Sequence, residues 1–279
     1  MIQIGVKRYF LGIILILTSV LAGCSPSLPT SQPDPVMLTQ PAQEMELFPT
    51  AAPGLQTSPT ASLPALTVPP TGTSPAPMAP PLAFAICTPI QDHPLDQLRL
   101  IVSDPYRPPK GKSDARHHGV DFSYYRYGDR DTIQGVGVQA VLPGKVAAAL
   151  VDSYPFGNLV MIETEVELLP VDLSERLGAQ PGESLYLLYA HMEGAPLMRI
   201  GDQTDACQLF GAVGKSGNAV EPHLHLETRL GPAGTVFSAM GEYFAGASEA
   251  ERAAYRLWRT SGVYRHLDPM LLLNYALEN

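Results

Sequence analysis

The sequence predicts a mainly β domain: an antiparallel sheet followed by a helical extension near the C-terminus. Past residue 83, short segments either alternate between apolar and polar residues or form apolar runs rich in β-branched residues, as strands do. Turns that contain glycine or proline separate them, which is typical of antiparallel folds. The predicted strands cover residues 136–142, 145–151, 159–163, 184–190, 209–213 and 223–228, and the turns lie at 143–144, 155–158, 181–182 and 216–218.

The extension after the last predicted strand contains a helix-start signal. Ser248 and Glu251 have the spacing of a capping box, and the residues up to Arg259 are predicted to form a helix. Trp258, the only tryptophan of the chain, lies on this helix and is expected to pack it against the sheet. The extension is therefore predicted to cover one sheet face.

Proline marks how the chain is divided. Of its 28 prolines in 279 residues, 15 lie between residues 25 and 82, where only three residues are charged. A segment of this composition cannot bury enough apolar surface to offset its chain entropy, so residues 24–82 are predicted to be a disordered tether. The remainder, residues 83–279, is long enough for one domain with a sizeable core.

The first 23 residues are predicted to be a signal peptide. The apolar run of residues 9–22 follows Lys7 and Arg8, and as a helix it would span about 21 Å, less than the ~30 Å of a hydrocarbon core. The ending at residues 21–24 resembles the lipobox of bacterial lipoprotein precursors, which implies a lipidated Cys24 and a membrane anchor at the outer face of the cytoplasmic membrane or in the cell envelope. The alternative is a secreted protein with an incidental cysteine.

Cysteine usage and charge limit the possible cross-links and binding partners. In an oxidising exterior, Cys87 and Cys207 can form a disulfide, or they can remain two buried thiols. The formal net charge is −9, and no basic run is longer than Lys7-Arg8. Nucleic-acid binding requires clustered cations, so nucleic acid is excluded as a partner. We expect a monomer.

Two histidine patterns have the spacing of a metal site. In residues 116–121, His117 and Asp121 flank a glycine that lets the chain bend, so both side chains can face one Zn²⁺; paired histidines also occur on solvated turns. In residues 222–227, alternation places His223 and His225 on one strand face, where one can be a ligand and the other not. The alternative is an exposed edge strand with two solvated histidines.

A third histidine, His191, points to a metal site only when it is considered together with these two patterns. His191 ends an apolar run, a position more often occupied by a core or rim residue. Together the patterns supply two histidines and an aspartate as ligands, with further histidines nearby, and they leave a fourth zinc position open for water, as in catalytic sites. Zinc would give a hydroxide nucleophile at neutral pH, and the unligated histidines would assist proton transfer and stabilise the oxyanion.

Six segments in order resemble the LytM/lysostaphin-type zinc endopeptidases, which cut peptide bonds in bacterial peptidoglycan. The resemblance implies that His117, Asp121 and His225 bind zinc and that His191 and His223 are catalytic without being ligands. His118 is then expected either to contact the zinc ligands without binding zinc itself, or to be solvated. The family's antiparallel metallopeptidase fold agrees with the strand pattern. The segments are HHGVD, VQAVLPGKV, FGNLVMIE, LYAHM, GAVGKSGN and PHLHLE, between residues 117 and 227.

The predicted function is that of a zinc endopeptidase acting on the stem or cross-link peptides of peptidoglycan. The long connection 164–183 and the extension after Glu227 depart from the family pattern and are expected to reshape the substrate groove. One alternative is a non-catalytic relative that binds the wall or activates an amidase. Another is a biotinyl or lipoyl carrier, which residues 138–150 resemble, but Lys145 has no flanking methionines.

Overall fold

The computed structural model describes residues 84–278. The predicted signal peptide, the lipidated Cys24 and the tether of residues 24–82 lie outside these residues. Within residues 84–278, the helices are all too short or too polar to cross a bilayer.

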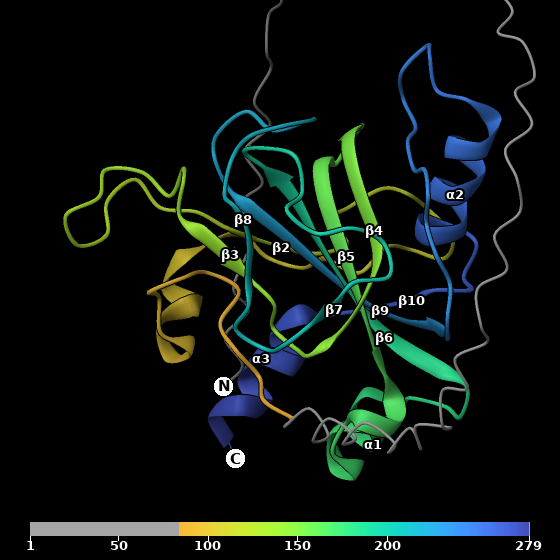
Figure 1. Ribbon diagram of the computed structural model, residues 1–279, viewed down its shortest axis with the longest axis horizontal. Helices are drawn as coiled ribbons and strands as arrows, with labels where there is room; N and C mark the ends of the chain where they lie inside the picture. Colours follow the sequence, from red (N-terminus) through yellow and green to blue (C-terminus); the bar gives the residue numbers. More distant parts are fainter. Residues whose placement is uncertain (1–83, 279) are drawn as a thin grey trace, which may run out of the picture. The chain divides into compact units, whose positions relative to one another are not determined.

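An eight-stranded antiparallel sheet forms the centre of the described part (Figure 1). Its order is β1-β2-β9-β6-β5-β4-β7. Strand β10 also pairs with β9, at residues 228–230, beyond the residues of β9 that pair with β2. The predicted fold class, a mainly antiparallel β domain with a helical extension, is confirmed. The strands are β1 (Val102–Asp104), β2 (Val120–Phe122), β4 (Gly144–Ser153), β5 (Gly157–Glu165), β6 (Glu183–Met192), β7 (Gln203–Thr204), β9 (Leu224–Pro232) and β10 (Arg265–Leu267).

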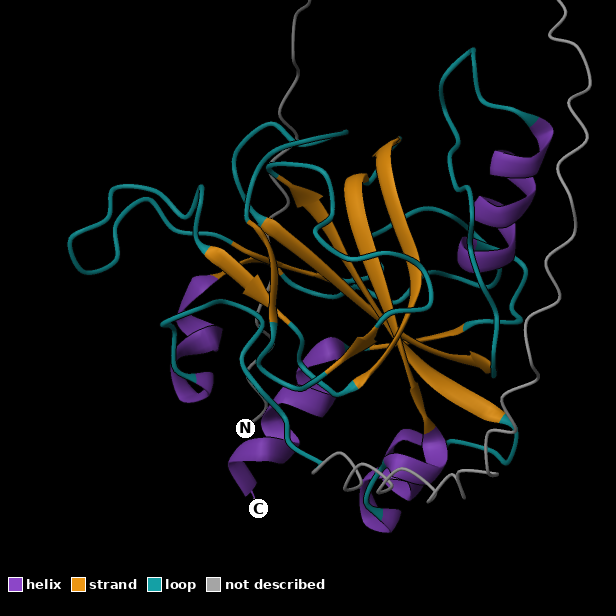
Figure 2. Cartoon of the chain, viewed as in Figure 1, coloured by secondary structure: helices purple, strands orange, loops and turns teal. Residues whose placement is uncertain are grey.

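Helical segments and a small second sheet surround this large sheet (Figure 2). The predicted strand 136–142 is shorter than expected, because the N–H of Val141 donates to the hydroxyl of Tyr189 and not to a neighbouring strand. The small sheet pairs β3 (Gly137–Gln139) with β8 (Leu209–Ala212), and the helical segments are η1 (Leu95–Ile101), η2 (Val166–Leu168), α1 (Val171–Leu177), α2 (Glu249–Arg259) and α3 (Pro269–Glu278).

Both faces of the large sheet are buried. On β6, Leu185 and Leu187 belong to one apolar core, and Leu188 and Ala190 belong to the other. Successive strand side chains point to opposite faces, so an apolar run such as β6 has to lie at the sheet centre with both sides covered. Residues of η1, α1, α3 and the small sheet cover the first face.

The helix α2 covers the second face, as the capping box and Trp258 led us to expect. Ser248 accepts a hydrogen bond from the backbone of Glu251, whose side chain accepts one from the backbone of Ser248. Tyr255 and Trp258, three residues apart and therefore on one side of the helix, are both buried in the core of this face. The loop before α2 adds Phe237. The face that α2 covers also contains His225 of β9, whose neighbours Leu224 and Leu226 belong to the core of the first face.

A disulfide joins the start of the described chain to the turn between β7 and β8. The Cα atoms of Cys87 and Cys207 lie 5.3 Å apart, and 120 positions separate the two residues. Replacing both with serine is expected to lower the free energy of unfolding by about 4 to 5 kcal/mol, because the bridge restricts a long loop of the unfolded chain. Urea unfolding of the oxidised protein and the double variant measures this; equal midpoints would contradict it.

Candidate metal centre and active site

Strand register brings the metal-ligand candidates together. Strand β2 pairs with β9 so that Asp121 lies directly opposite His225. Side chains at directly opposed positions of an antiparallel pair lie on the same face and close together. His117 lies in the loop that leads into β2. The sheet thus joins residues more than one hundred positions apart in the sequence into one cluster.

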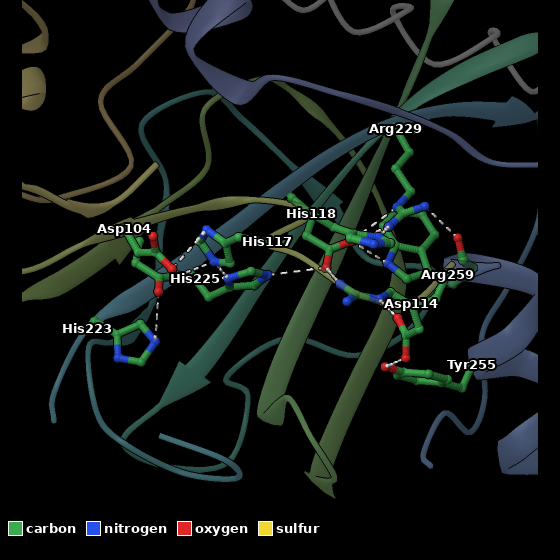
Figure 3. Close-up of polar contacts among 12 residues, drawn as sticks. Asp104, Asp114, His117, His118, His223, His225, Arg229, Tyr255 and Arg259 are labelled. Atoms are coloured by element: carbon green, nitrogen blue, oxygen red, sulfur yellow. Dashed lines mark hydrogen bonds and ion pairs between the residues drawn. The ribbon is translucent and has the colours of Figure 1, made fainter. Parts of the chain in front are cut away.

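The three candidate ligand atoms are in mutual contact (Figure 3). The Nε2 atom of His117 lies 3.0 Å from Asp121 Oδ1 and 3.1 Å from His225 Nδ1. The distance from His225 Nδ1 to Asp121 Oδ1 is 2.8 Å. His225 is buried, and His117 and Asp121 are half-buried at the bottom of a cavity.

The remaining ring nitrogens of these histidines fix their tautomers. His117 Nδ1 lies 3.0 Å from the carbonyl oxygen of Pro105, and His225 Nε2 lies 3.2 Å from Glu227 Oε1. A carbonyl or carboxylate oxygen only accepts, so these two nitrogens hold the ring protons and donate. The lone pairs of the neutral rings are therefore on His117 Nε2 and His225 Nδ1, the two atoms that face Asp121.

With both rings neutral, two imidazole lone pairs and a carboxylate oxygen meet at one point and repel each other, and a proton or a metal cation among them removes this repulsion. Zn²⁺ takes this combination of nitrogen and oxygen donors, and histidine ligands of zinc commonly donate their second ring N–H to a carboxylate or carbonyl, as both do here. The residues present therefore fit zinc. With three protein ligands, a fourth position is left for water or substrate.

Electrostatics around His225 also favour a positive charge. Burial lowers the pKa of His225, but the neighbouring carboxylates of Asp121 and Glu227 more than offset it and raise the pKa to about 9. Burial likewise raises the pKa of Asp121, and its contacts with His117 and His225 outweigh this and hold the pKa far below its usual value. A proton and a metal ion thus compete for His225 Nδ1, so zinc uptake near neutral pH releases a proton.

His191 lies beside the cluster as a neutral base. Burial, and then the charges of His225 and His223, lower its pKa to about 3. Its Nδ1–H donates to the carbonyl oxygen of Ser216 at 2.8 Å, which leaves the lone pair on Nε2. The backbone of His191 has a φ of 62°, a left-handed conformation uncommon for a non-glycine residue and frequent at functional sites.

His223 completes the group and lies beside both His191 and Asp121. The two ring centroids are 4.6 Å apart. His223 Nδ1 lies 2.8 Å from the carbonyl oxygen of Glu221, and its Nε2 lies 3.6 Å from Asp121 Oδ2, beyond hydrogen-bond distance. All five residues singled out by the sequence line one cavity of about 390 Å³, whose wall also includes the exposed Val220 and the partly buried Arg259.

Gly119, between His117 and Asp121, allows a close approach of two backbones. A Cβ atom at this position would collide with the carbonyl oxygen of Leu226 and lie 2.9 Å from Cε1 of His225. We expected the glycine to let the chain bend, but its φ is not left-handed. Glycine is required here because this loop packs closely against β9 and against His225, the candidate ligand on β9.

The structure decides between the alternatives for two neighbouring positions. Of the two alternatives for His118, solvation fails: the side chain is fully buried, and its Nδ1 accepts a hydrogen bond from Arg229 Nη2 at 2.8 Å. Burial and the charge of Arg259 lower its pKa to about 4. The alternative of an exposed edge strand for His223 and His225 also fails. His225 is on β9, which lies between β2 and β6, and His223, just before β9, forms a bridge with Gly214.

A set of buried charges behind the candidate metal ligands was not predicted from the sequence. Glu227 accepts from His225 on one oxygen and from Arg229 and Trp258 on the other, and Arg259 also donates to it. Alternation along β9 could have found two of them, because residues 223, 225, 227 and 229 are all polar and share one face. Nothing in the local sequence links Arg259 to this site.

No protein-family model matches the chain, and no curated protein matches its sequence. Among matching solved structures, the catalytic domain of the antimicrobial peptidase lysostaphin from Staphylococcus simulans has 22% identity and a TM-score of 0.37, with 66% of this chain and 99% of that one covered. A mutant catalytic domain of the prophage-encoded M23 protein EnpA from Enterococcus faecalis has 22% identity and a TM-score of 0.34, with 53% and 92% covered.

A zinc-containing peptidase from Vibrio cholerae has 20% identity and a TM-score of 0.32, with 46% of this chain and 33% of that one covered. This chain therefore spans about a third of the length of the Vibrio cholerae protein. Superpositions at these scores carry no argument about activity. The matched structures are peptidases of the M23, LytM and lysostaphin type, which is the type that the six segments of the sequence resemble.

Proposed function

We propose that the protein is a zinc-dependent endopeptidase that hydrolyses peptide bonds in the stem or cross-link peptides of bacterial peptidoglycan. The observation that carries this proposal is the convergence of His117, Asp121, His191, His223 and His225 in one cavity. Three of them direct electron pairs to a single point, and the other two flank it. The substrate class comes from the six-segment resemblance, and the export signal predicted for residues 1–23 agrees with it.

Zinc, when bound, lowers the pKa of a coordinated water to about 7 and polarises the carbonyl of the scissile bond. His117, Asp121 and His225 would hold it, with Pro105 and Glu227 fixing the orientation of the two rings. The chain's own residues supply the rest of the chemistry. An extended peptide can reach them because the cavity is open to solvent beside the exposed Val220.

His191 is suited to orient the attacking water. Its Nδ1–H is engaged by Ser216, so its Nε2 can only accept, and a water donating to it has its own lone pair free for attack. If Nε2 takes up the proton, the carbonyl of Ser216 stabilises the imidazolium. His223 lies beside Asp121 in the same cavity, and its Nδ1–H is engaged by the carbonyl of Glu221. In its imidazolium form it also has a proton on Nε2, with which it can stabilise the developing oxyanion or donate to the leaving amine.

Digestion of purified peptidoglycan tests the proposal. The zinc-loaded protein is expected to release new amine termini without new reducing sugars, and mass spectrometry of the fragments should show shortened stems or separated cross-links. A chelator should stop the reaction, and added zinc should restore it. A protein that binds zinc and peptidoglycan but leaves every peptide intact would contradict the proposal and favour the non-catalytic wall-binding alternative.

A further inference from the structure

The helix α2 contributes three side chains to the environment of the zinc ligands. Trp258 and Arg259 lie three and four residues after Tyr255, so the side of α2 that contains Tyr255 presents all three to the sheet. Trp258 is fully buried, and Arg259 exposes only 11% of its side chain. Arg259 also lines the active-site cavity.

Arg259 and His225 donate to the same carboxylate oxygen. Oε1 of Glu227 accepts from Nε2 of His225 at 3.2 Å and from Nη1 of Arg259. The other oxygen, Oε2, accepts from Nε1 of Trp258 at 2.8 Å and from Arg229. The helix α2 thus contributes one donor to each oxygen of Glu227. Arg259, the donor to Oε1, sets the position of the oxygen that accepts from the His225 ring and orients it.

The same guanidinium also holds the segment that leads to His117 (Figure 3). Nε of Arg259 donates to Oδ1 of Asp114 at 2.7 Å, and Asp114 lies three residues before His117. The other oxygen of Asp114 accepts from the hydroxyl groups of Tyr255, at 2.8 Å, and of Tyr243. The charged and hydroxyl partners of Asp114 therefore all come from α2 and the loop that precedes it.

The charges in this cluster balance. Glu227 and Asp114 are both ionised: burial raises the pKa of each, but the charge of Arg259 contributes to lowering both below their usual values, together with Arg229 at Glu227. Two buried carboxylates thus face two buried guanidinium groups. Arg229 stays on Glu227 if Arg259 is removed, and two hydroxyl groups stay on Asp114, so neither carboxylate would be left without a donor.

We propose that Arg259 is a positioning residue of the metal site, which aligns His117 and His225 for one zinc ion by bridging Asp114 and Glu227. The α2 extension is then part of the metal centre as well as a cover for the sheet. This inference rests on the zinc-ligand assignment of the proposed function and on no assumption about the substrate. Lysine cannot replace Arg259 fully, because one ammonium group lacks the planar fork that reaches two carboxylates.

Zinc affinity of the full chain, measured by competition with a chelator, tests this inference without any substrate. Arg259→Met is expected to raise the zinc Kd by about 10- to 100-fold, which is the usual effect of removing a group that orients a ligand. Arg259→Lys should give an intermediate Kd. Arg256→Met, on the same helix but 53% exposed and paired with Glu242 at the surface, is the matched control and should stay within about twofold of the wild type.

A double-variant cycle separates positioning from general stabilisation. If Arg259 acts by tying Asp114 to Glu227, the zinc Kd of Arg259→Met combined with Asp114→Asn should match that of Arg259→Met alone, because the bridge is already lost. Unfolding of each metal-free variant by urea measures the stability change separately. If Arg259→Met fails to fold, the Kd values of Asp114→Asn and Arg259→Lys decide, and both should exceed that of the wild type.

Two results would overturn the inference. One is a folded Arg259→Met protein with the zinc Kd of the wild type, even if it is less stable. The other is a double variant whose loss of zinc-binding free energy equals the sum of the losses in the two single variants. A wild-type protein that takes up no zinc would instead refute the proposed function and this inference with it, whereas a failure to cleave peptidoglycan would leave the inference standing.

Discussion

The variant His225→Ala is expected to lose both its zinc and its peptidase activity. His225 supplies one of the three proposed ligand atoms, and its removal also leaves Glu227 and Asp121 without the ring that separates them. Two remaining ligands cannot hold zinc against a chelator. We expect the release of amine termini from peptidoglycan to fall at least about a thousandfold, to the level of the metal-free protein. Zinc content and activity of the same preparation measure this.

A variant at a second candidate ligand keeps the test informative if His225→Ala fails to fold. Asp121→Asn keeps the size of the side chain and removes its charge, and it should also abolish zinc retention and activity. Thermal unfolding of both variants shows whether they remain folded. Cleavage at the wild-type rate by a folded His225→Ala protein would contradict the assignment of His225 as a ligand.

The variant His191→Asn is expected to lower kcat by about 10²- to 10⁴-fold while zinc stays bound. Asparagine is chosen because it tolerates the left-handed backbone that His191 adopts and can still donate to Ser216. What it removes is the acceptor at Nε2 that orients the attacking water. The effect should therefore appear in kcat, with the zinc Kd close to that of the wild type.

The split between zinc binding and turnover distinguishes His191 from the ligands. Loss of zinc in a folded His191→Asn protein would make His191 a ligand and contradict the geometry, in which the side chains that could hold one metal ion together are His117, Asp121 and His225. Unchanged kcat in the zinc-loaded variant would contradict its role in orienting water.

The sheet and the residues of the site were predictable because their signals are local. Alternation and apolar runs indicate β4, β5, β6 and β9 from a few residues each, and the capping box at Ser248 indicates the start of α2. The register that places Asp121 opposite His225 was not readable, because β2 has three residues, too few to show an alternating pattern. The histidine patterns taken together, and then the resemblance, placed these two residues in one site before the structure did.

The supporting charges were hidden for a different physical reason. Arg259 has the sequence context of any cation in the last turn of a helix, where solvent exposure is the usual outcome. Its burial depends on two carboxylates from distant segments, Asp114 and Glu227, that meet only in the folded sheet. The two alternatives for His118 stayed open for the same reason, since the guanidinium of Arg229 that accompanies its burial belongs to β9.

Diffraction from crystals of the zinc-loaded protein at the zinc absorption edge tests the central claim most directly. The account requires one anomalous peak at about 2.0 to 2.2 Å from His117 Nε2, Asp121 Oδ1 and His225 Nδ1. His191 and His223 should lie outside bonding distance of that peak. A zinc ion bonded to His191 or His223, or bound away from these three atoms, would contradict the account.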